Sequence, residues 1–306
     1  MTVRMISKFI TVALTPFGRN KMVLYISIIS FLRFLGLNNN WKEKLLKYPS
    51  TNSLYFIKTF IKPSSGGKYT YFTNSIDDLR YSCRMNFNDW EFVSRHFFVS
   101  IAADCGLILD VGAYTGVYSI ETAIQNPHCI INSYEPNPEI FLNLQKNVET
   151  NALSSRIKLS QLALGHKNEI SNLYIPDDRP GSSKATLNTK SLKYSRIHVS
   201  TLDELYFAKF INLIKIDIEG YETEVFEGGQ NVLSQFKPII LAEANSQNEL
   251  KRQQATLSKY GYREPSQIFP GSKGDRRNFV WFSAKDEARV KLFLNNSTAV
   301  FLKYQF

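Results

Sequence analysis

A buried strand that runs directly into a glycine-bracketed turn is the feature that most constrains this fold. Residues 107–116 read Leu-Ile-Leu-Asp-Val-Gly-Ala-Tyr-Thr-Gly, and a helical pattern follows over residues 117–126. In an open α/β sheet, such a junction is where a ligand binds, beyond the carboxyl end of the first strand. The turn needs glycine because the backbone must bend sharply and approach the ligand closely. The junction therefore predicts a ligand pocket at one edge of an α/β sheet.

Predicted strands and helices alternate after this junction. Such alternation is typical of a mostly parallel sheet with helices on both faces. Before the junction, two β-rich segments joined by a Pro-Ser-Ser-Gly-Gly turn predict a hairpin over residues 54–72. We expect helices over 88–101, 138–151, 222–233 and 247–260, and strands over 107–111, 130–135, 157–161, 169–175, 211–218, 239–243 and 278–283.

The excess positive charge lies in the first fifth of the chain. Residues 1–61 carry nine Lys and Arg side chains against one acid, which is +8 of the net charge of +10. The rest is nearly balanced, so nucleic-acid binding by the whole fold is weakly supported. An apolar run of about 11 residues from Met22 is shorter than the about 20 needed to span a bilayer. A helix packed on the domain and a basic helix at a membrane surface both stay open for this segment.

The cysteines point to a reducing compartment. Cys83, Cys105 and Cys129 are odd in number, widely spaced and without a Cys-x-x-Cys pair. This pattern indicates neither a disulfide framework nor a zinc site. Free thiols are typical of cytosolic proteins, so we expect a cytoplasmic protein, with peripheral membrane contact through the basic segment as an alternative.

Acids stand at the ends of four predicted strands. They are Asp110, Glu135, Asp217 with Glu219 close behind, and Glu243. Because parallel strands place their carboxyl ends on one edge of the sheet, we expect these acids to converge on one rim. Oxygen ligands of this kind also suit hard cations, but nothing in the spacing demands a metal, and we expect none.

Glu135 indicates which ligand the junction binds. It lies 19 residues after Gly116, where a carboxylate accepts hydrogen bonds from the two ribose hydroxyls of a nucleoside cofactor. A dinucleotide site would show Gly-x-Gly-x-x-Gly, but here the middle glycine is absent, and no triphosphate-binding loop occurs. S-adenosylmethionine fits better, because it has a ribose, no phosphate, an amino group and a positive sulfonium.

At these motifs the sequence resembles the FkbM-type methyltransferases, a family of class I S-adenosylmethionine-dependent enzymes. The resemblance covers about residues 90–283, with all motifs in the family's order. Tyr114 departs from the pattern, because the family usually has Asn there. The matching segments are Leu-Asp-Val-Gly-Ala-Tyr-Thr-Gly (109–116), Tyr-Glu-Pro-Asn-Pro (134–138) with Leu144 and Asn147, Ala-Leu-Gly (163–165), Ser-Thr-Leu-Asp-Glu-Leu (200–205), Leu-Ile-Lys-Ile-Asp-Ile-Glu-Gly-Tyr-Glu (213–222) and Pro-Ile-Ile-Leu-Ala-Glu (238–243).

The resemblance implies a fold and a set of site residues. It implies a class I, Rossmann-like methyltransferase domain over residues 86–306, with the last strand antiparallel, after a basic extension of helices and a hairpin over residues 1–85. Asp217 and Glu219 would sit beside the reacting methyl group. The cofactor would be bound by Asp110, Gly112, Ala113, Tyr114 and Gly116 at its methionine end, by Glu135 at the ribose, by Pro136, Asn137 and Ala163 at the adenine, and by Asp217.

Methyl transfer to a hydroxyl also needs a general base, because the acceptor must lose a proton. Asp217 and Glu219 are the best candidates by location. Lys215 lies two residues before Asp217, so its side chain should point to the same face of a regular strand and could neutralise that acid. The resemblance implies O-methylation of a small-molecule or glycan acceptor, such as a sugar or other secondary metabolite. The alternatives are a membrane-surface binding protein on a vestigial scaffold and a nucleic-acid methyltransferase.

Overall fold

The computed structural model describes residues 57–61, 69–73, 90–175, 187, 193–205, 210–268, 271 and 274–303. Residues 1–56, which hold most of the basic segment to which we assigned leader helices and membrane contact, lie outside these ranges, as does Cys83. Cys105 and Cys129 are buried free thiols, as expected. Within the described ranges, no helix is both long enough and apolar enough to cross a membrane.

A seven-stranded sheet forms the centre of the molecule. Its strand order is β11-β12-β10-β9-β3-β4-β5. The strands from β10 to β5 are parallel to one another, whereas β12 is antiparallel to both β10 and β11. The mostly parallel sheet with an antiparallel last strand is the class I methyltransferase arrangement that we expected. The strands are β3 (Leu107–Val111), β4 (Ile130–Tyr134), β5 (Ile157–Ser160), β9 (Ile211–Ile216), β10 (Ile239–Glu243), β11 (Ser266–Gln267) and β12 (Asn278–Trp281).

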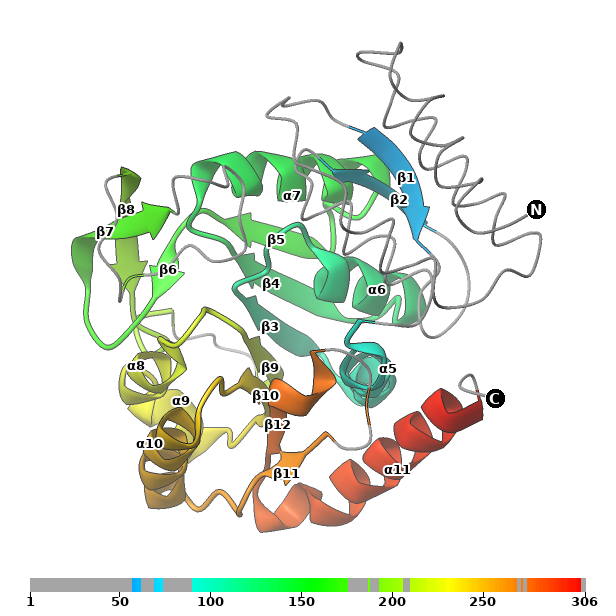
Figure 1. Ribbon diagram of the computed structural model, residues 1–306, viewed down its shortest axis with the longest axis vertical. Helices are drawn as coiled ribbons and strands as arrows, with labels where there is room; N and C mark the ends of the chain where they lie inside the picture. Colours follow the sequence, from blue (N-terminus) through cyan, green and yellow to red (C-terminus); the bar gives the residue numbers. More distant parts are fainter. Residues whose placement is uncertain are drawn as a thin grey trace, which may run out of the picture.

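Helices cover both faces of this sheet (Figure 1). Strand β3 is buried along its whole length, because the helices of the two faces enclose it. One face packs against α5 (Phe92–Ile101), α6 (Val117–Gln125), α7 (Pro138–Thr150) and α11 (Glu287–Lys303). The other face packs against α8 (Glu222–Glu227), α9 (Gln230–Gln235) and α10 (Gln247–Leu257).

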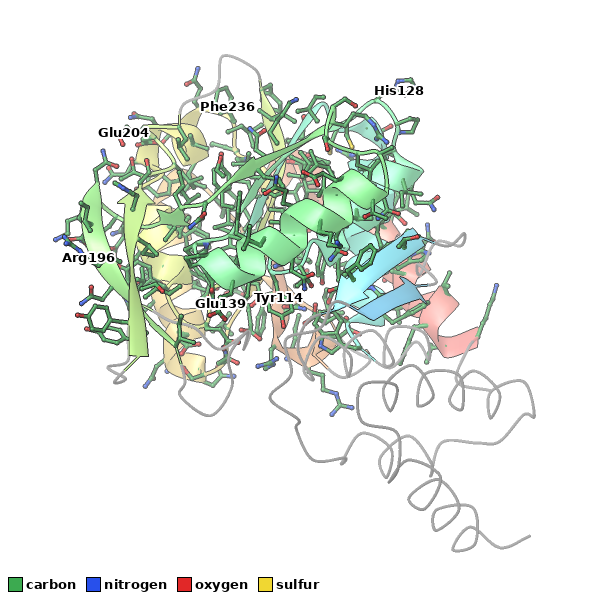
Figure 2. The ribbon with its side chains drawn as sticks, turned by 90° about the horizontal axis from the view of Figure 1, so that it is seen from above. Tyr114, His128, Glu139, Arg196, Glu204 and Phe236 are labelled. Carbon is green, nitrogen blue, oxygen red and sulfur yellow. The ribbon has the colours of Figure 1, made fainter. Side chains whose placement is uncertain are left out.

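Two smaller sheets flank the centre. The predicted hairpin is confirmed as an antiparallel pair of β1 (Ile57–Ile61) and β2 (Tyr69–Thr73). From above, this pair lies beside α7, on the side away from β7 (Figure 2). The other sheet has the order β6-β8-β7, of which only β7 (Glu169–Ile175) was predicted, and β6 (Ala163–Leu164) and β8 (Lys193–Ser200) were not.

One predicted helix is wrong in detail. The pattern over residues 222–233 forms two short helices, α8 and α9, which break at Gly228 and Gly229. The break has a packing cause: a Cβ atom on Gly228 would lie 2.0 Å from the carbonyl oxygen of Gly165. The chain therefore approaches the segment after β6 so closely that glycine is needed here, and two consecutive glycines disfavour a continuous helix.

Candidate active site

The glycine-bracketed turn after β3 is tied to the neighbouring strands. The backbone N–H groups of Gly112 and Ala113 both donate to the carbonyl of Tyr134, at 3.0 Å. Gly112 has φ +75°, and a Cβ atom there would meet the carbonyl oxygen of Asp217 at 2.0 Å. Both the conformation and the contact with the end of β9 therefore require glycine at this position.

Tyr114, the departure from the family pattern, has a left-handed backbone at φ +51°. Among residues other than glycine, Asn is several-fold enriched in this region. The Asn usual in the family therefore suits the backbone of this turn, and Tyr114 holds the same conformation at a higher steric cost. Backbone strain of this kind gathers at functional sites.

Glu135 follows β4 directly and is almost fully buried, at 6% exposure. Its Oε2 accepts the backbone N–H of Tyr114 at 3.0 Å, and its Oε1 accepts that of Asn137 at 2.9 Å. Burial raises the pKa of Glu135 to about 7, although the two backbone N–H groups oppose the shift. Asn137 is itself held in place because its side chain accepts the N–H of Glu139 and caps α7.

Lys215 lies where the turn meets β9. Its Nζ donates to the carbonyl of Gly112 at 2.8 Å and lies 3.6 Å from both Asp110 Oδ1 and Asp217 Oδ2. Lys215 and Asp217 thus share a face of the strand, as the spacing predicts. Burial lowers the pKa of Lys215, but Asp217 and Asp110 outweigh burial and leave this pKa raised. The lysine is therefore charged, and it partly neutralises the acids at the ends of two strands.

Two further carboxylates stand across from Glu135. Glu91 begins α5 and accepts the hydroxyl of Tyr118 at 2.9 Å. Glu243 ends β10, pairs with Arg277 Nη1 at 3.0 Å and accepts the Asn245 side-chain amide at 2.8 Å. Burial, with Asp217 as the next cause, raises the pKa of Glu91 to about 8 and that of Glu243 to about 9.

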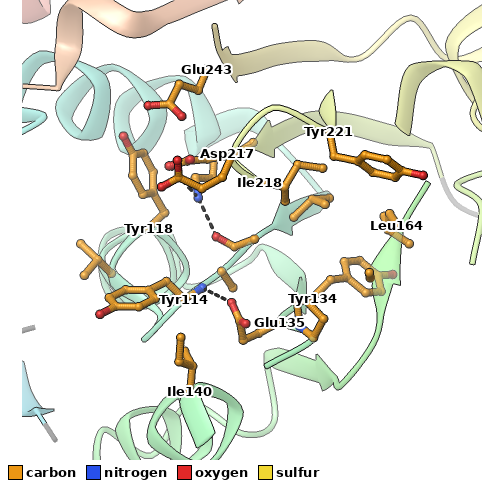
Figure 3. A pocket seen from close by; sticks show the side chains of 18 of the residues that line it. Tyr114, Tyr118, Tyr134, Glu135, Ile140, Leu164, Asp217, Ile218, Tyr221 and Glu243 are labelled. Carbon is orange, nitrogen blue, oxygen red and sulfur yellow. Dashed lines mark hydrogen bonds and ion pairs between the residues drawn. The ribbon is translucent and has the colours of Figure 1, made fainter. Parts of the chain in front are cut away.

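These groups face one pocket (Figure 3). Glu135 and Ile140 lie on one side of it, and Asp217 and Glu243 lie on the opposite side. We call the two parts the Glu135 end (Gly112, Ala113, Tyr114, Glu135, Pro136) and the Glu91 end (Trp90, Glu91, Glu243, Arg277). Between them, Lys215, Asp217 and Glu219 also line the pocket, and beyond Glu135 it continues along Leu162, Ala163 and Leu164.

Three predicted cofactor-binding residues lie behind the described lining of this pocket. Asp110 is fully buried, accepts the Ser119 hydroxyl at 2.5 Å and pairs with Lys215. Gly116 has φ +94° and begins α6. Asn137 caps α7. All three therefore lie next to groups that line the pocket, and their part in cofactor binding stays a prediction.

The sequence reasoning missed several lining residues. Tyr71, Trp90, Glu91, Tyr118 and Arg277 all line the pocket. Of these, the sequence singled out Trp90 alone, as an apolar position of the predicted helix, and that pattern indicated a role in packing. Glu91 and Arg277 stand at no predicted strand end, and their nearness depends on contacts between distant segments.

The residues that build the Glu135 end fall within a known family. The model of the Methyltransferase FkbM domain matches residues 110–264, half of the chain. A curated relative, "Methyltransferase 1" of Beauveria bassiana, is 24% identical over 159 residues, which cover 45% of this chain and 64% of the relative. The match thus covers less than two thirds of that protein.

Solved structures of methyltransferases are also similar. The FkbM methyltransferase of Methylobacillus flagellatus KT is 18% identical with a TM-score of 0.44, covering 58% of this chain and 44% of that chain. The tRNA methyltransferase TrmK of B. subtilis is 12% identical with a TM-score of 0.40, covering 63% of this chain and 67% of its own. The family match over half of the sequence identifies the group: this chain belongs to the FkbM family of methyltransferase domains.

Proposed function

We propose that this protein transfers the methyl group of S-adenosylmethionine to a hydroxyl of a sugar, glycan or other secondary metabolite. The observation that carries the proposal is the buried carboxylate of Glu135 in the pocket wall. Each of its oxygens accepts one backbone N–H. A carboxylate offers about four acceptor positions, so both oxygens can accept a second hydrogen bond. Two adjacent ribose hydroxyls supply two such donors.

The rest of the Glu135 end suits the same cofactor. The backbone of Gly112 and Ala113 approaches the pocket closely, which suits the methionine part of the molecule. Pro136 and Ala163, with Leu162 and Leu164, give an apolar surface for the adenine. The residues present therefore fit S-adenosylmethionine from one end to the other.

The chemistry asked of the protein is positioning and removal of one proton. S-adenosylmethionine supplies a methyl group on a positively charged sulfur, and on transfer the carbon–sulfur bond breaks as the acceptor oxygen bonds the carbon. Asp217 and Glu219 stand where the turn and β9 meet and are the proposed acceptors of the hydroxyl proton. Lys215 Nζ lies 3.6 Å from Asp217 Oδ2 and forms an ion pair with it. Holding the reacting groups in line is the main contribution of such an enzyme.

The charge of the pocket favours a neutral acceptor over nucleic acid. Its lining holds two cations and five acids. With two cations among its described lining residues, this pocket is not the extended basic surface that nucleic-acid binding requires. We therefore propose a small-molecule or glycan acceptor. The acids are Glu91, Glu135, Asp217, Glu219 and Glu243, and the cations are Lys215 and Arg277.

Titration calorimetry with S-adenosylmethionine tests the cofactor assignment. The wild type should bind, and Glu135→Ala should weaken binding at least about 100-fold, because hydrogen bonds to a charged group contribute about 1.5–3 kcal/mol each. Glu149→Ala, at an exposed acid on α7, is the control and should bind normally. Normal binding by Glu135→Ala would refute the ribose role of Glu135.

The proton acceptors are tested by turnover. Asp217→Asn and Glu219→Gln should keep cofactor binding in calorimetry but lose transfer of labelled methyl to the acceptor. Unchanged turnover in both variants would refute this assignment. Methylation of RNA or DNA with none of a sugar would refute the acceptor class.

A further inference from the structure

The Glu91 end of the pocket comes largely from outside the part of the chain that matches the family. That match spans residues 110–264. Trp90 and Glu91 precede it and Arg277 follows it, yet all three line the pocket together with Glu243. The Glu135 end, by contrast, lies within the matched residues. The Glu91 end therefore draws mainly on residues that flank the matched range.

Distant segments hold this end in a fixed shape. The carboxylate of Asp275 accepts the N–H groups of Val93 and Ser94, at 3.2 and 2.7 Å, and the hydroxyl of Ser94 at 2.5 Å. Asn278 also donates to the Ser94 hydroxyl, at 2.9 Å. Asp275 is fully buried, so this cap fastens the start of α5 to the segment before β12. Glu91 and Arg277 flank this joint.

The backbone of Glu91 is adapted to its position. Glu91 has φ +44°, an uncommon conformation for a residue other than glycine. A Cβ atom on Gly274 would lie only 2.6 Å from Glu91 Cγ. The side chain therefore packs directly on the Gly274 backbone. Glu91 thus has a strained backbone, and its side chain requires glycine at position 274. Such strain is typical of residues at functional sites.

The chemistry of this end is that of hydroxyl recognition. Glu91 Oε2 accepts the Tyr118 hydroxyl, and both residues line the same cavity. Arg277 uses one nitrogen, Nη1, for both Glu243 and the Asn245 side-chain oxygen at 2.7 Å. A guanidinium carries five N–H donors, and this one is half exposed at the pocket. Trp90 adds an aromatic surface that is half buried.

We infer that the Glu91 end is an acceptor subsite for an uncharged polyhydroxylated ring, with Glu91 and Arg277 as the residues that select it. The inference rests on the proposed function, which places the cofactor at the Glu135 end. The carboxyl oxygens accept hydrogen bonds from hydroxyl groups, and the guanidinium donates hydrogen bonds to hydroxyl or ring oxygens. Trp90 packs against the carbon-bound hydrogens of the ring. A phosphate on the acceptor would lie near Asp217, and Arg277, the cation of this end, is already engaged with Glu243 and Asn245, so the subsite favours an uncharged ring.

The test compares neutral sugars with their phosphates. Labelled S-adenosylmethionine is incubated with the full chain and a panel of methyl hexopyranosides, and in parallel with the matching hexose 6-phosphates. Wild type should methylate at least one neutral hexoside with a kcat/KM at least tenfold above that for its phosphate. Glu91→Gln and Arg277→Met should each raise the KM for that hexoside at least tenfold, with the Kd for S-adenosylmethionine unchanged within twofold.

Two controls and a second variant keep the outcome clear. Glu287→Gln and Arg263→Met change exposed residues that face each other away from the pocket, at 4.0 Å, and should leave the KM unchanged. Arg277→Lys keeps the positive charge at an exposed position, so this variant should fold. Its KM for the hexoside tests the subsite even if Glu91→Gln fails to fold.

Several results would overturn the subsite alone. They are no transfer to any neutral hexoside, equal or better transfer to the phosphates, or an unchanged KM in the variants, in each case with wild type that binds S-adenosylmethionine. Wild type that does not bind S-adenosylmethionine would instead overturn the proposed function.

Discussion

Glu135 is held by backbone groups that lie near it in the sequence, whereas the Glu91 end is held by contacts across nearly the whole domain. Glu135 accepts N–H groups two and 21 positions away. The cap that fixes the start of α5 joins Val93 to Asp275, 182 positions apart. The contacts of Glu135 thus form a local motif, whereas the Glu91 end depends on segments that lie far apart in the chain.

Lys215 lies between the two ends and should show the largest effect. Lys215→Met leaves Asp110 buried without its cation, and breaking a buried ion pair costs about 3–5 kcal/mol. We expect the free energy of unfolding in urea to fall by about that amount. Lys291→Met removes an exposed pair with Glu287, and should change it by less than about 1 kcal/mol. Equal, small losses in both would show that Lys215 does not hold the two ends together.

Asp275 tests the long-range cap. Asp275→Ala removes three hydrogen bonds at the start of α5, and loss of a capping side chain costs up to about 2 kcal/mol. We expect a lower unfolding free energy and a higher KM for the acceptor, with the Kd for S-adenosylmethionine changed less than about threefold. Asn137→Ala removes the cap of α7 beside Glu135. It should raise the Kd for S-adenosylmethionine and change the KM for the acceptor less. If both variants weaken the cofactor equally, the two ends are not independent.

The pH dependence of cofactor binding tests the charge on Glu135. Its pKa is raised to about 7, and ribose binding needs the ionised form. Affinity for S-adenosylmethionine should therefore be full above pH 7 and fall about tenfold per pH unit below it, as measured by calorimetry between pH 5 and 7.5. Glu135→Gln lacks the titrating group and should give a nearly flat profile. A flat profile in wild type would show that this carboxyl does not titrate on binding.

Tyr71 should show the smallest effect. This fully buried tyrosine of β2 shares a hydrogen bond with the Thr115 hydroxyl in the glycine-bracketed turn. Tyr71→Phe removes that bond and keeps the ring, so we expect a loss of about 1 kcal/mol, seen as cofactor binding about fivefold weaker. Thr70→Val, on the same strand, is the control and should bind normally. A larger effect in the control would show that β2 acts only by packing.

Local sequence patterns predicted most of the central sheet but not the whole site. Strands β3, β4, β5, β7, β9 and β10, the turn and Glu135 were predictable, because each depends on local periodicity and on glycine and acid at fixed spacing. The division of α8 from α9 was not, since it depends on the close approach of Gly228 to Gly165. Helix α11 was missed because its apolar pattern is weak, with Leu292 exposed. Glu91 and Arg277 gave no local signal at all.

A structure of the protein with S-adenosylhomocysteine bound tests the central claim most directly. The account predicts both ribose hydroxyls within hydrogen-bond distance of Glu135 and the sulfur directed toward Asp217 and the Glu91 end. A ribose at the Glu91 end, or one that makes no contact with Glu135, would contradict it.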